Sequence, residues 1–261
     1  MMLRRFTRRI TSLGLTAPGT DAQVVRSTDL VTFPESVQRY LRFMGVVDHA
    51  RDWSFRAHFK GRFRMRPGLP WLPLDSWQYN FAPEVVRLFY MRLRVGRVVP
   101  MYGWDTYVGG YGKMLGKVLG LVTVADGEGE AFDTGELTTY LNDAIIFAPS
   151  MLLRDETSWS GVNDESFDVA LSDAGNTVTA RVVIDDLGAP RDFSSDDRFA
   201  TLPDGLARTR WSTPIEGWHR VNGHPLPTAA SAVWHLPDGP FPYAEFDLRD
   251  DAVVRNVAPE P

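Results

Sequence analysis

Residues 53–67 alternate between apolar and polar side chains. The odd positions hold Trp53, Phe55, Ala57, Phe59, Gly61, Phe63 and Met65, and the even positions hold Ser54, Arg56, His58, Lys60, Arg62, Arg64 and Arg66. Because successive side chains of a strand point to opposite faces, the pattern predicts a long β-strand with an aromatic face and a basic face. The basic face is expected to be the solvated outer side of an antiparallel sheet, with attraction of an anionic ligand as the alternative.

Later segments repeat this alternation with aromatic residues. It recurs over residues 77–81 and 100–108, while residues 85–95 are at first apolar on both faces, which predicts a strand in the middle of the sheet. In the second half, residues 167–171 and 178–184 alternate on either side of the turn sequence 173–176. We count eleven to thirteen strands in all, with no internal repeat.

Two segments carry helical periodicity. Residues 34–44 begin with a proline, which suits the first helical position, and show apolar residues at spacings of three and four. Residues 133–147 begin with Asp133 and Glu136 at the spacing of a capping box, and their apolar stripe is expected to lie across the sheet. The predicted fold is therefore mainly β (α+β), a curved antiparallel sheet or half-barrel of about eleven strands wrapped around one or two helices.

Composition places the chain among ordinary globular proteins. Its 261 residues are 44% hydrophobic and 23% charged, with a net charge of -5. This acidic balance argues against nucleic-acid binding, which needs a basic surface. We predict a single domain over residues 32–261, preceded by a flexible basic arm and linker over residues 1–31.

The N-terminal segment holds Arg4, Arg5, Arg8 and Arg9 before a short apolar patch. The patch is too short for a secretory signal, so we expect a mobile basic arm or a short amphipathic helix. No run of about 18 apolar residues occurs, so stable membrane insertion is not expected. We predict a cytoplasmic protein rather than an exported one.

Several kinds of chemistry find no support in the sequence. The chain has no cysteine, which excludes disulfides, a thiolate nucleophile and a cysteine zinc site. Its five histidines lack the spacing of a metal pair on one face. The sequence GGYGKMLGKVLG over residues 109–120 fits neither a phosphate loop nor a dinucleotide fingerprint, and its glycines are expected at bends or close backbone approaches. We therefore expect neither a metal nor a cofactor.

The candidate binding residues are mostly aromatic. Trp and Tyr side chains bury large apolar surfaces and keep one polar atom, so many of them in predicted strands favour a cavity with a few polar handles over an ordinary core. The predicted ligand-contacting residues are Trp77, Tyr79, Tyr90, Trp104, Tyr107, Asn142, Arg210, Trp211, Trp218 and Trp234. A carboxylate beside buried aromatics gains a raised pKa and can act as general acid or base, which makes Asp105 and Asp143, with Tyr140, the catalytic candidates.

A set of short motifs resembles one known family. The motifs are Phe33–Leu41, Tyr140–Asp143, Ala148–Leu153, Trp159, Asp197–Phe199, Arg210–Pro214 and Gly223–Pro227. In this order they resemble a bacterial family of uncharacterised proteins, a domain of unknown function, over about residues 33–257. The resemblance implies an architecture similar to that of LolA-type lipoprotein carriers, in which a curved antiparallel sheet wraps around helices and leaves an apolar cavity. Unlike those carriers, the chain shows no clear export signal and no lipidation cysteine.

Two functions follow from these expectations. The first is binding of a hydrophobic or amphipathic small molecule, such as a lipid or polyketide, in an aromatic-lined cavity. The second is a cofactor-independent cyclase or isomerase that acts on such a substrate in secondary metabolism, with Asp105, Asp143 or Tyr140 moving a proton. The expected partner is an apolar small molecule, and the protein is expected to be a monomer or a homodimer.

Overall fold

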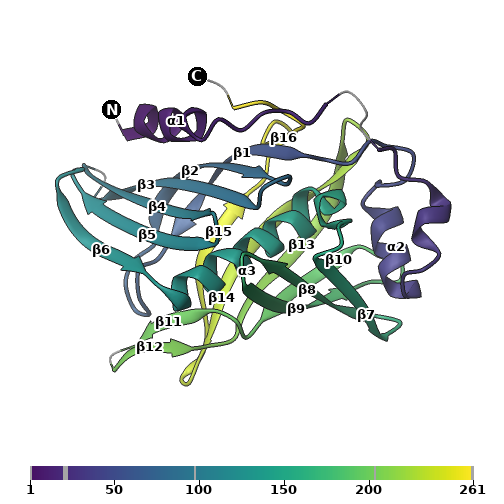
Figure 1. Cartoon of the computed structure of the whole chain (residues 1–261). Helices are drawn as coiled ribbons and strands as arrows, with labels where there is room; N and C mark the ends of the chain where they lie inside the picture. The colour runs from purple at the N-terminus through teal and green to yellow at the C-terminus, as the bar shows by residue number, and fades with distance from the viewer. Residues whose placement is uncertain (1, 20–22, 97, 203, 260–261) are drawn as a thin grey trace.

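The computed structural model describes residues 2–19, 23–96, 98–202 and 204–259. It confirms the predicted mainly β fold: one large antiparallel sheet curves around a central helix and does not close on itself (Figure 1). The strand order is β6-β5-β4-β3-β2-β1-β15-β14-β13-β10-β9-β8-β7, and β16 also pairs with β1. A separate two-stranded sheet consists of β11 and β12.

The first half of the sheet contains β1 (Ser54–Phe63), β2 (Leu72–Phe81), β3 (Val86–Val95), β4 (Val99–Val108), β5 (Tyr111–Val118) and β6 (Val122–Glu128). The second half contains β7 (Thr157–Asn163), β8 (Ser166–Asp173), β9 (Asn176–Ile184), β10 (Pro190–Ser195), β13 (Trp211–Val221), β14 (His224–Leu236), β15 (Gly239–Asp247) and β16 (Val253–Arg255). The small sheet is β11 (Phe199–Leu202) and β12 (Gly205–Arg208). Strands of three or four residues are too short to show a period, and they raise the strand number of the described chain above the predicted one.

The helices are α1 (Met2–Ser12), α2 (Glu35–Phe43) and α3 (Glu130–Phe147), with 3-10 turns at Ser27–Leu30 and Pro149–Leu152. The predicted helix over 34–44 is confirmed, with Pro34 as the residue before its first turn. The N-terminal segment contains the amphipathic helix that was one of its two expected forms. Phe6 and Ile10 of α1 are buried against the outer face of the sheet, while its arginines are exposed.

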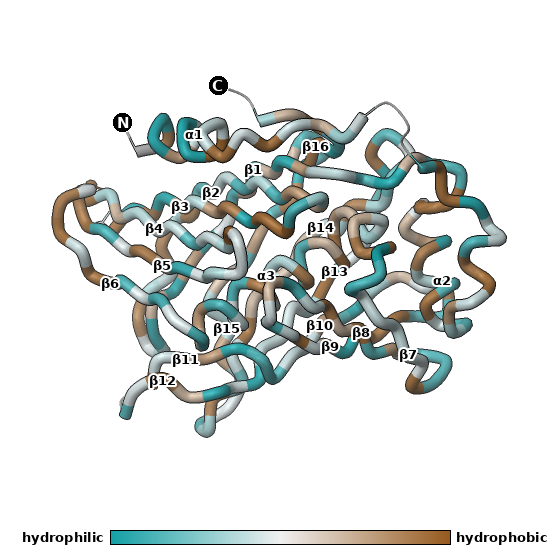
Figure 2. The backbone as a smooth tube through the Cα atoms, in the orientation of Figure 1, coloured by the Kyte–Doolittle hydropathy of each residue, from teal (hydrophilic) through white to brown (hydrophobic). Residues whose placement is uncertain are grey.

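Strand β1 has the predicted two faces. Phe55 and Phe59 are buried on the inner face and contact Phe147 of α3, with ring centroids 5.7 and 5.3 Å apart. On the outer face, His58 lies 2.7 Å from a carboxylate oxygen of Asp75. Hydrophobic and hydrophilic positions are interspersed along the strands of the sheet (Figure 2). The alternation thus separates a concave inner face from a convex outer face.

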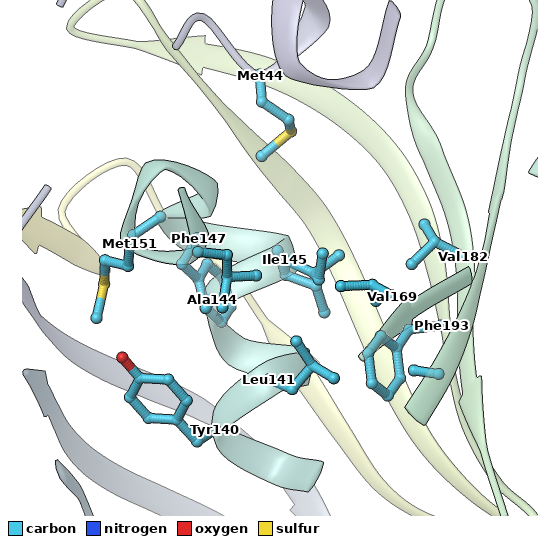
Figure 3. Close-up of a cluster of buried hydrophobic side chains, with 14 of the residues drawn as sticks. Met44, Tyr140, Leu141, Ala144, Ile145, Phe147, Met151, Val169, Val182 and Phe193 are labelled. Carbon is cyan, nitrogen blue, oxygen red and sulfur yellow. The ribbon is translucent and has the colours of Figure 1, made fainter. Parts of the chain in front are cut away.

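Helix α3 is buried on nearly every side, because the curved sheet surrounds it. Its residues from Gly135 to Phe147 are all buried. Leu141, Ile145 and their neighbours pack against Val169, Val182 and Phe193 of the second half of the sheet (Figure 3). This side of α3 is therefore filled core, and the helix closes the concave side of the sheet as the sequence predicted.

The start of α3 differs from the prediction. The helix begins at Glu130, and Gly129 with φ of +100° precedes it, so Asp133 is not the capping residue. The Asp133 carboxylate instead accepts a hydrogen bond from the backbone N–H of Gly112 on β5, at 2.6 Å. A side chain at Gly112 would come within 2.0 Å of the Phe132 carbonyl oxygen, so glycine permits this close approach of strand and helix.

Candidate functional site

A cavity of about 360 Å³ lies between the concave face of the sheet and α3. Its volume falls in the range of about 300–1,000 Å³ that is typical of small-molecule sites. Most of its wall is apolar, with side chains from β1 to β5, α3, β11 and β13 to β15. The larger apolar residues of this wall are Phe59, Phe63, Leu74, Phe89, Met91, Met114, Phe132, Ile146, Phe147, Trp211, Trp234, Phe241 and Phe246.

One part of the wall is polar and buried. We call Gln78, Arg87, Asp105, Glu136, Asn142 and Asp143 the polar cluster; all six line the cavity. Arg87, only 4% exposed, donates from Nε to Asp143 Oδ2 at 2.7 Å and from Nη1 to Glu136 Oε2 at 2.8 Å. Gln78 donates a further hydrogen bond to the same Asp143 oxygen at 2.6 Å. A buried guanidinium thus holds two carboxylates of α3 against the sheet.

Sheet register and helix periodicity bring these residues together. Gln78 on β2 lies opposite Phe89 on β3, and Phe89 lies opposite Asp105 on β4, so all three project from the inner face. Glu136 and Asp143 are seven residues apart, which places them two turns apart on one side of α3. The polar cluster is therefore a property of the fold and needs no irregular backbone.

Two carboxyl groups of the polar cluster, those of Glu136 and Asp105, have raised pKa values. Burial, reinforced by repulsion from Asp105, raises the pKa of Glu136 to about 7, although Arg87 and Arg198 oppose the shift. Burial likewise raises the pKa of Asp105, against the attraction of the same two arginines. Near neutral pH, Glu136 therefore stands between its acid and base forms, which is the condition for exchanging a proton.

Two oxygen atoms of the polar cluster are unsatisfied. Asp105 Oδ1 and Asn142 Oδ1 are buried and have no hydrogen-bond partner among the residues that the structure describes. Asn142 as a whole is only 5% exposed, and its amide nitrogen donates weakly, at 3.5 Å, to Asp143. Buried acceptors without partners are destabilising, so these two atoms mark where a hydrogen-bond donor would be stabilised.

Arg198 is a further cation of the cavity wall, which also includes Arg64 and Arg66. The guanidinium carbon of Arg198 is 4.4 Å from the ring centroid of Trp211 and 5.2 Å from that of Trp234. The Trp211 indole donates to the hydroxyl of Tyr243 at 3.1 Å, and Arg198 contacts the same hydroxyl at 3.4 Å. These contacts fix the two indoles as part of the cavity wall.

The structure brings five of the predicted site residues to the cavity. They are Asp105, Asn142, Asp143, Trp211 and Trp234. Asp105 and Asn142 carry the unsatisfied oxygens, and Asp143 is the partner of Arg87. Any role of these residues in binding or catalysis remains a prediction.

Four predicted ligand-contacting residues lie on the opposite face of the sheet. Trp77, Tyr79, Tyr90 and Trp104 pack together on the outer face with Phe6 and Ile10 of α1. The reason is the period of two: their neighbours at positions 78, 89 and 105 point to the cavity, so these rings must point away from it. The aromatic pattern located the strands but did not indicate which face was hollow.

The other predicted residues are held in place by contacts outside the cavity. Tyr140 is buried in the core, and its hydroxyl donates to the Phe81 carbonyl at 3.3 Å. The Tyr107 hydroxyl donates to the Asp173 carboxylate at 2.9 Å. Arg210 donates to Ser194 at 3.1 Å on the outer side of the second half of the sheet.

Trp218 is also outside the cavity. Its indole donates to the carbonyl of Pro190 at 2.9 Å, and its ring contacts that of Phe43 on α2, with centroids 5.5 Å apart. The ring therefore fixes α2 to the sheet.

Sequence reasoning missed Gln78, Arg87 and Glu136. Glu136 has the spacing of a capping box with Asp133. It also lies seven residues before Asp143, which predicts that the two side chains lie on the same side of the helix. Arg87 interrupts the apolar run of residues 85–90, and a cation inside a buried strand predicts a buried anionic partner.

Within the ranges that the structure describes, no group of three or more histidine, aspartate or glutamate residues is arranged to hold a metal ion. The helices in those same ranges are too short or too polar to cross a membrane.

Comparisons with known proteins place the chain in a family. Residues 23–246 match the family of unknown function DUF6544, and the chain belongs to that family, which confirms the predicted resemblance to an uncharacterised family. No match was found among functionally curated proteins.

Two solved structures are similar in fold. One is a LolA superfamily protein from Nitrosomonas europaea, with 11% identity and a TM-score of 0.41, covering 81% of this chain and 89% of that chain. The other is a domain described as an outer membrane lipoprotein-sorting protein from Vibrio parahaemolyticus, with 7% identity and a TM-score of 0.37, covering 78% of this chain and 85% of that chain. Neither likeness carries a ligand or a partner over to this chain.

Proposed function

We propose that this protein binds a hydrophobic or amphipathic small molecule, such as a lipid or polyketide, in the cavity between the sheet and α3. The observation that supports the proposal is the cavity itself, with its volume of about 360 Å³ and its predominantly aromatic and aliphatic wall. Transfer of apolar surface from water into such a wall is favourable by about 25 cal/mol for each Å² buried. The polar cluster at one side of the wall orients the guest.

The test uses an uncharged fluorescent probe, N-phenyl-1-naphthylamine, and a side chain that fills the cavity. Ala230 of β14 lines the cavity, whereas Ala229 lies on the other face of the same strand. We expect the parent protein to bind the probe with enhanced fluorescence, and Ala230→Phe to lower its affinity at least about tenfold by excluding it from the cavity.

The control variant is Ala229→Phe, which adds the same ring outside the cavity and should leave probe affinity unchanged. Equal effects of the two substitutions, or no probe binding by the parent protein, would contradict the proposal. Native mass spectrometry of protein purified from its own host would then identify the natural guest by its mass.

A cofactor-independent cyclase or isomerase is the second candidate. In its favour, Glu136 has a pKa of about 7 and borders an apolar cavity, as a general acid or base requires. The test incubates the co-purified guest with the parent protein and with Asp105→Asn and Asp143→Asn. Conversion by the parent, with binding retained and conversion lost in a variant, supports an enzyme; recovery of the unchanged guest supports a binding protein.

A cytoplasmic location and a monomeric or homodimeric state remain predictions of the sequence. Cell fractionation tests the location. Size-exclusion chromatography with light scattering measures the mass in solution, for which we expect one or two copies of a 29.3 kDa chain.

A further inference from the structure

The polar cluster contains more hydrogen-bond acceptors than donors. Arg87 uses Nε and Nη1 for Asp143 and Glu136, and Gln78 uses its amide nitrogen for Asn80 and Asp143. In the described part of the chain, this leaves Asp105 Oδ1 and Asn142 Oδ1 buried and unsatisfied. At these two atoms the missing partner is therefore a donor, although Arg64 Nε and Arg198 Nε on the same cavity wall are buried donors that lack a partner in the described part of the chain.

The guest is the group best placed to supply that donor. A wholly apolar guest would leave both oxygens unsatisfied, and their desolvation would oppose its binding. A guest with a carboxylate or phosphate group would add further acceptors beside three carboxyl groups. A guest with N–H or O–H groups at this wall would instead satisfy the oxygens that the protein leaves open.

Charge distinguishes between an ammonium group and a hydroxyl group. At the polar cluster, the carboxyl groups of Asp105, Glu136 and Asp143 face the guanidinium groups of Arg87 and Arg198. Two more arginines, Arg64 and Arg66, line the cavity just after β1. Burial raises the pKa of Glu136 and that of Asp105, and repulsion from Asp105 adds to the rise in the pKa of Glu136. A nearby cation would stabilise their ionised forms, whereas a neutral hydroxyl would not.

We propose that the guest of the cavity is an amphipathic amine, whose protonated nitrogen lies against Asp105 and Asn142 while its apolar part lies among the phenylalanine and methionine side chains of the wall. This inference rests on the proposed function and names the chemical class of its ligand. Phe89, Met91 and Met114, which adjoin Asp105 on β3 and β5, form the start of the apolar path.

The test compares decylamine, decanol and decanoate, which share one chain and differ in head group. Isothermal titration calorimetry on the full chain should give the order of affinity decylamine, then decanol, then decanoate. Asp105→Asn keeps the shape of the side chain and removes its charge, so it should weaken decylamine binding by about tenfold to a hundredfold, because a charge-assisted hydrogen bond is lost. Decanol binding should change little, which also shows that the variant is folded.

The matched control is Asp168→Asn. Asp168 is an exposed carboxylate on β8 that pairs with Arg181 and lies outside the cavity. Its loss removes the same charge from the protein, and the affinity for all three compounds should stay the same. An equal effect of Asp105→Asn and Asp168→Asn on decylamine would overturn the proposal.

The pH dependence supplies a second readout. Glu136 is faced by Arg87, Arg198, Asp105 and Asp143 and has a pKa of about 7. Decylamine stays protonated up to about pH 10, as a lysine side chain does. Its affinity should therefore rise from pH 5.5 to pH 8 as Glu136 loses its proton, whereas decanol binding should stay level.

The outcomes separate this inference from the proposed function. If none of the three compounds binds, the cavity does not take amphipathic guests and both proposals fail. If decanoate binds as tightly as decylamine, the head group lies against Arg198 instead, and the amine proposal fails while the binding function stands. A flat pH profile for decylamine would also overturn the amine proposal.

Discussion

Strands β2 to β4 have two faces, formed by alternate residues of the same strands. These faces differ in almost every physical property. On the outer face, the ring of Tyr90 contacts Trp77 and Trp104, each with centroids 5.5 Å away, and Phe6 of α1 at 5.7 Å. On the inner face, Gln78 and Asp105 border a cavity. The aromatic face is packed solid, and the face with buried charges is hollow.

Aromatic residues line the cavity as well as the packed outer face, so a high density of them does not by itself indicate which face is hollow. Large rings fill space efficiently, and a helix with its own phenylalanine completes the packing. A cavity remains where side chains are small, as at Ala230 and Ala232 on β14, or where ion pairs fix side chains in place. Each of the following predictions changes a residue of one of the two faces.

The largest effect is expected from Arg87→Met. The substitution leaves the buried carboxylates of Asp143 and Glu136 without their cation, and breaking such a pair costs about 3–5 kcal/mol of unfolding free energy. Arg94→Met, at an exposed position of the same strand, should change stability by less than about 0.5 kcal/mol. Urea denaturation measures both, and similar values for the two variants would show that the polar cluster does not stabilise the inner face.

A smaller effect is expected on the outer face from Phe6→Ala. Phe6 is 4% exposed, and loss of its burial should weaken the docking of α1 by about 2 kcal/mol. Hydrogen exchange of the α1 amides should accelerate about thirtyfold, while exchange in β1 to β4 stays the same. Leu3→Ala, at a position that is 36% exposed, should have less effect. Loss of probe binding in Phe6→Ala would mean that the two faces are coupled.

The third prediction concerns pH. The pKa of Glu136 is about 7 in the folded protein against an ordinary value of 4.5, so the folded state binds the proton more tightly. Its contribution to stability is therefore greatest below pH 4.5 and is lost as the pH rises through about 7, with a fall on the order of 2 kcal/mol between pH 5 and 7. Subtracting the stability profile of Glu136→Gln from that of the parent protein should show this fall between pH 5 and 7. A level difference would mean that Glu136 titrates normally.

The smallest effect is expected from exchanging one tryptophan on each face. Trp234→Phe replaces the indole that Arg198 contacts in the cavity wall with a smaller phenyl ring. It should lower probe affinity about fivefold, equivalent to about 1 kcal/mol. Trp104→Phe on the outer face should leave probe affinity unchanged. Fluorescence titration with the probe measures the affinity of each variant. A larger loss of affinity in Trp104→Phe than in Trp234→Phe would place the guest on the outer face.

Much of this fold was predictable because the period of the apolar residues indicates both the type of each element and which of its side chains are buried. The alternation at Phe55 and Phe59 predicted the inner face of β1, and the stripe containing Leu141 and Ile145 predicted α3. The site was harder to predict. Strand β3 carries large apolar residues at successive positions, and β2 alternates with its aromatic residues on the convex face. The pattern alone therefore does not distinguish the convex from the concave face until α1 is seen to cover one of them.

The polar cluster shows why tertiary contacts override local motifs. Asp133 and Glu136 have capping-box spacing, but the helix begins at Glu130, directly after Gly129, and both carboxylates bond to the sheet. A single sequence cannot show this, because the partners Gly112 and Arg87 are distant along the chain. Ion pairs of this kind are found only when the strand register is known.

The failure of the main sheet to close has a consequence for encounters between copies of the protein. β6 and β7 are its terminal strands in the described part of the chain, and a terminal strand offers free backbone groups to an incoming strand. On β6, Val122 and Val124 are 59% and 51% exposed. We predict that association at high concentration begins by strand addition at this rim, and light scattering of Val124→Pro should show it suppressed. A high protein concentration would then lower the solubility of the protein through β6 before it changed the binding of the guest.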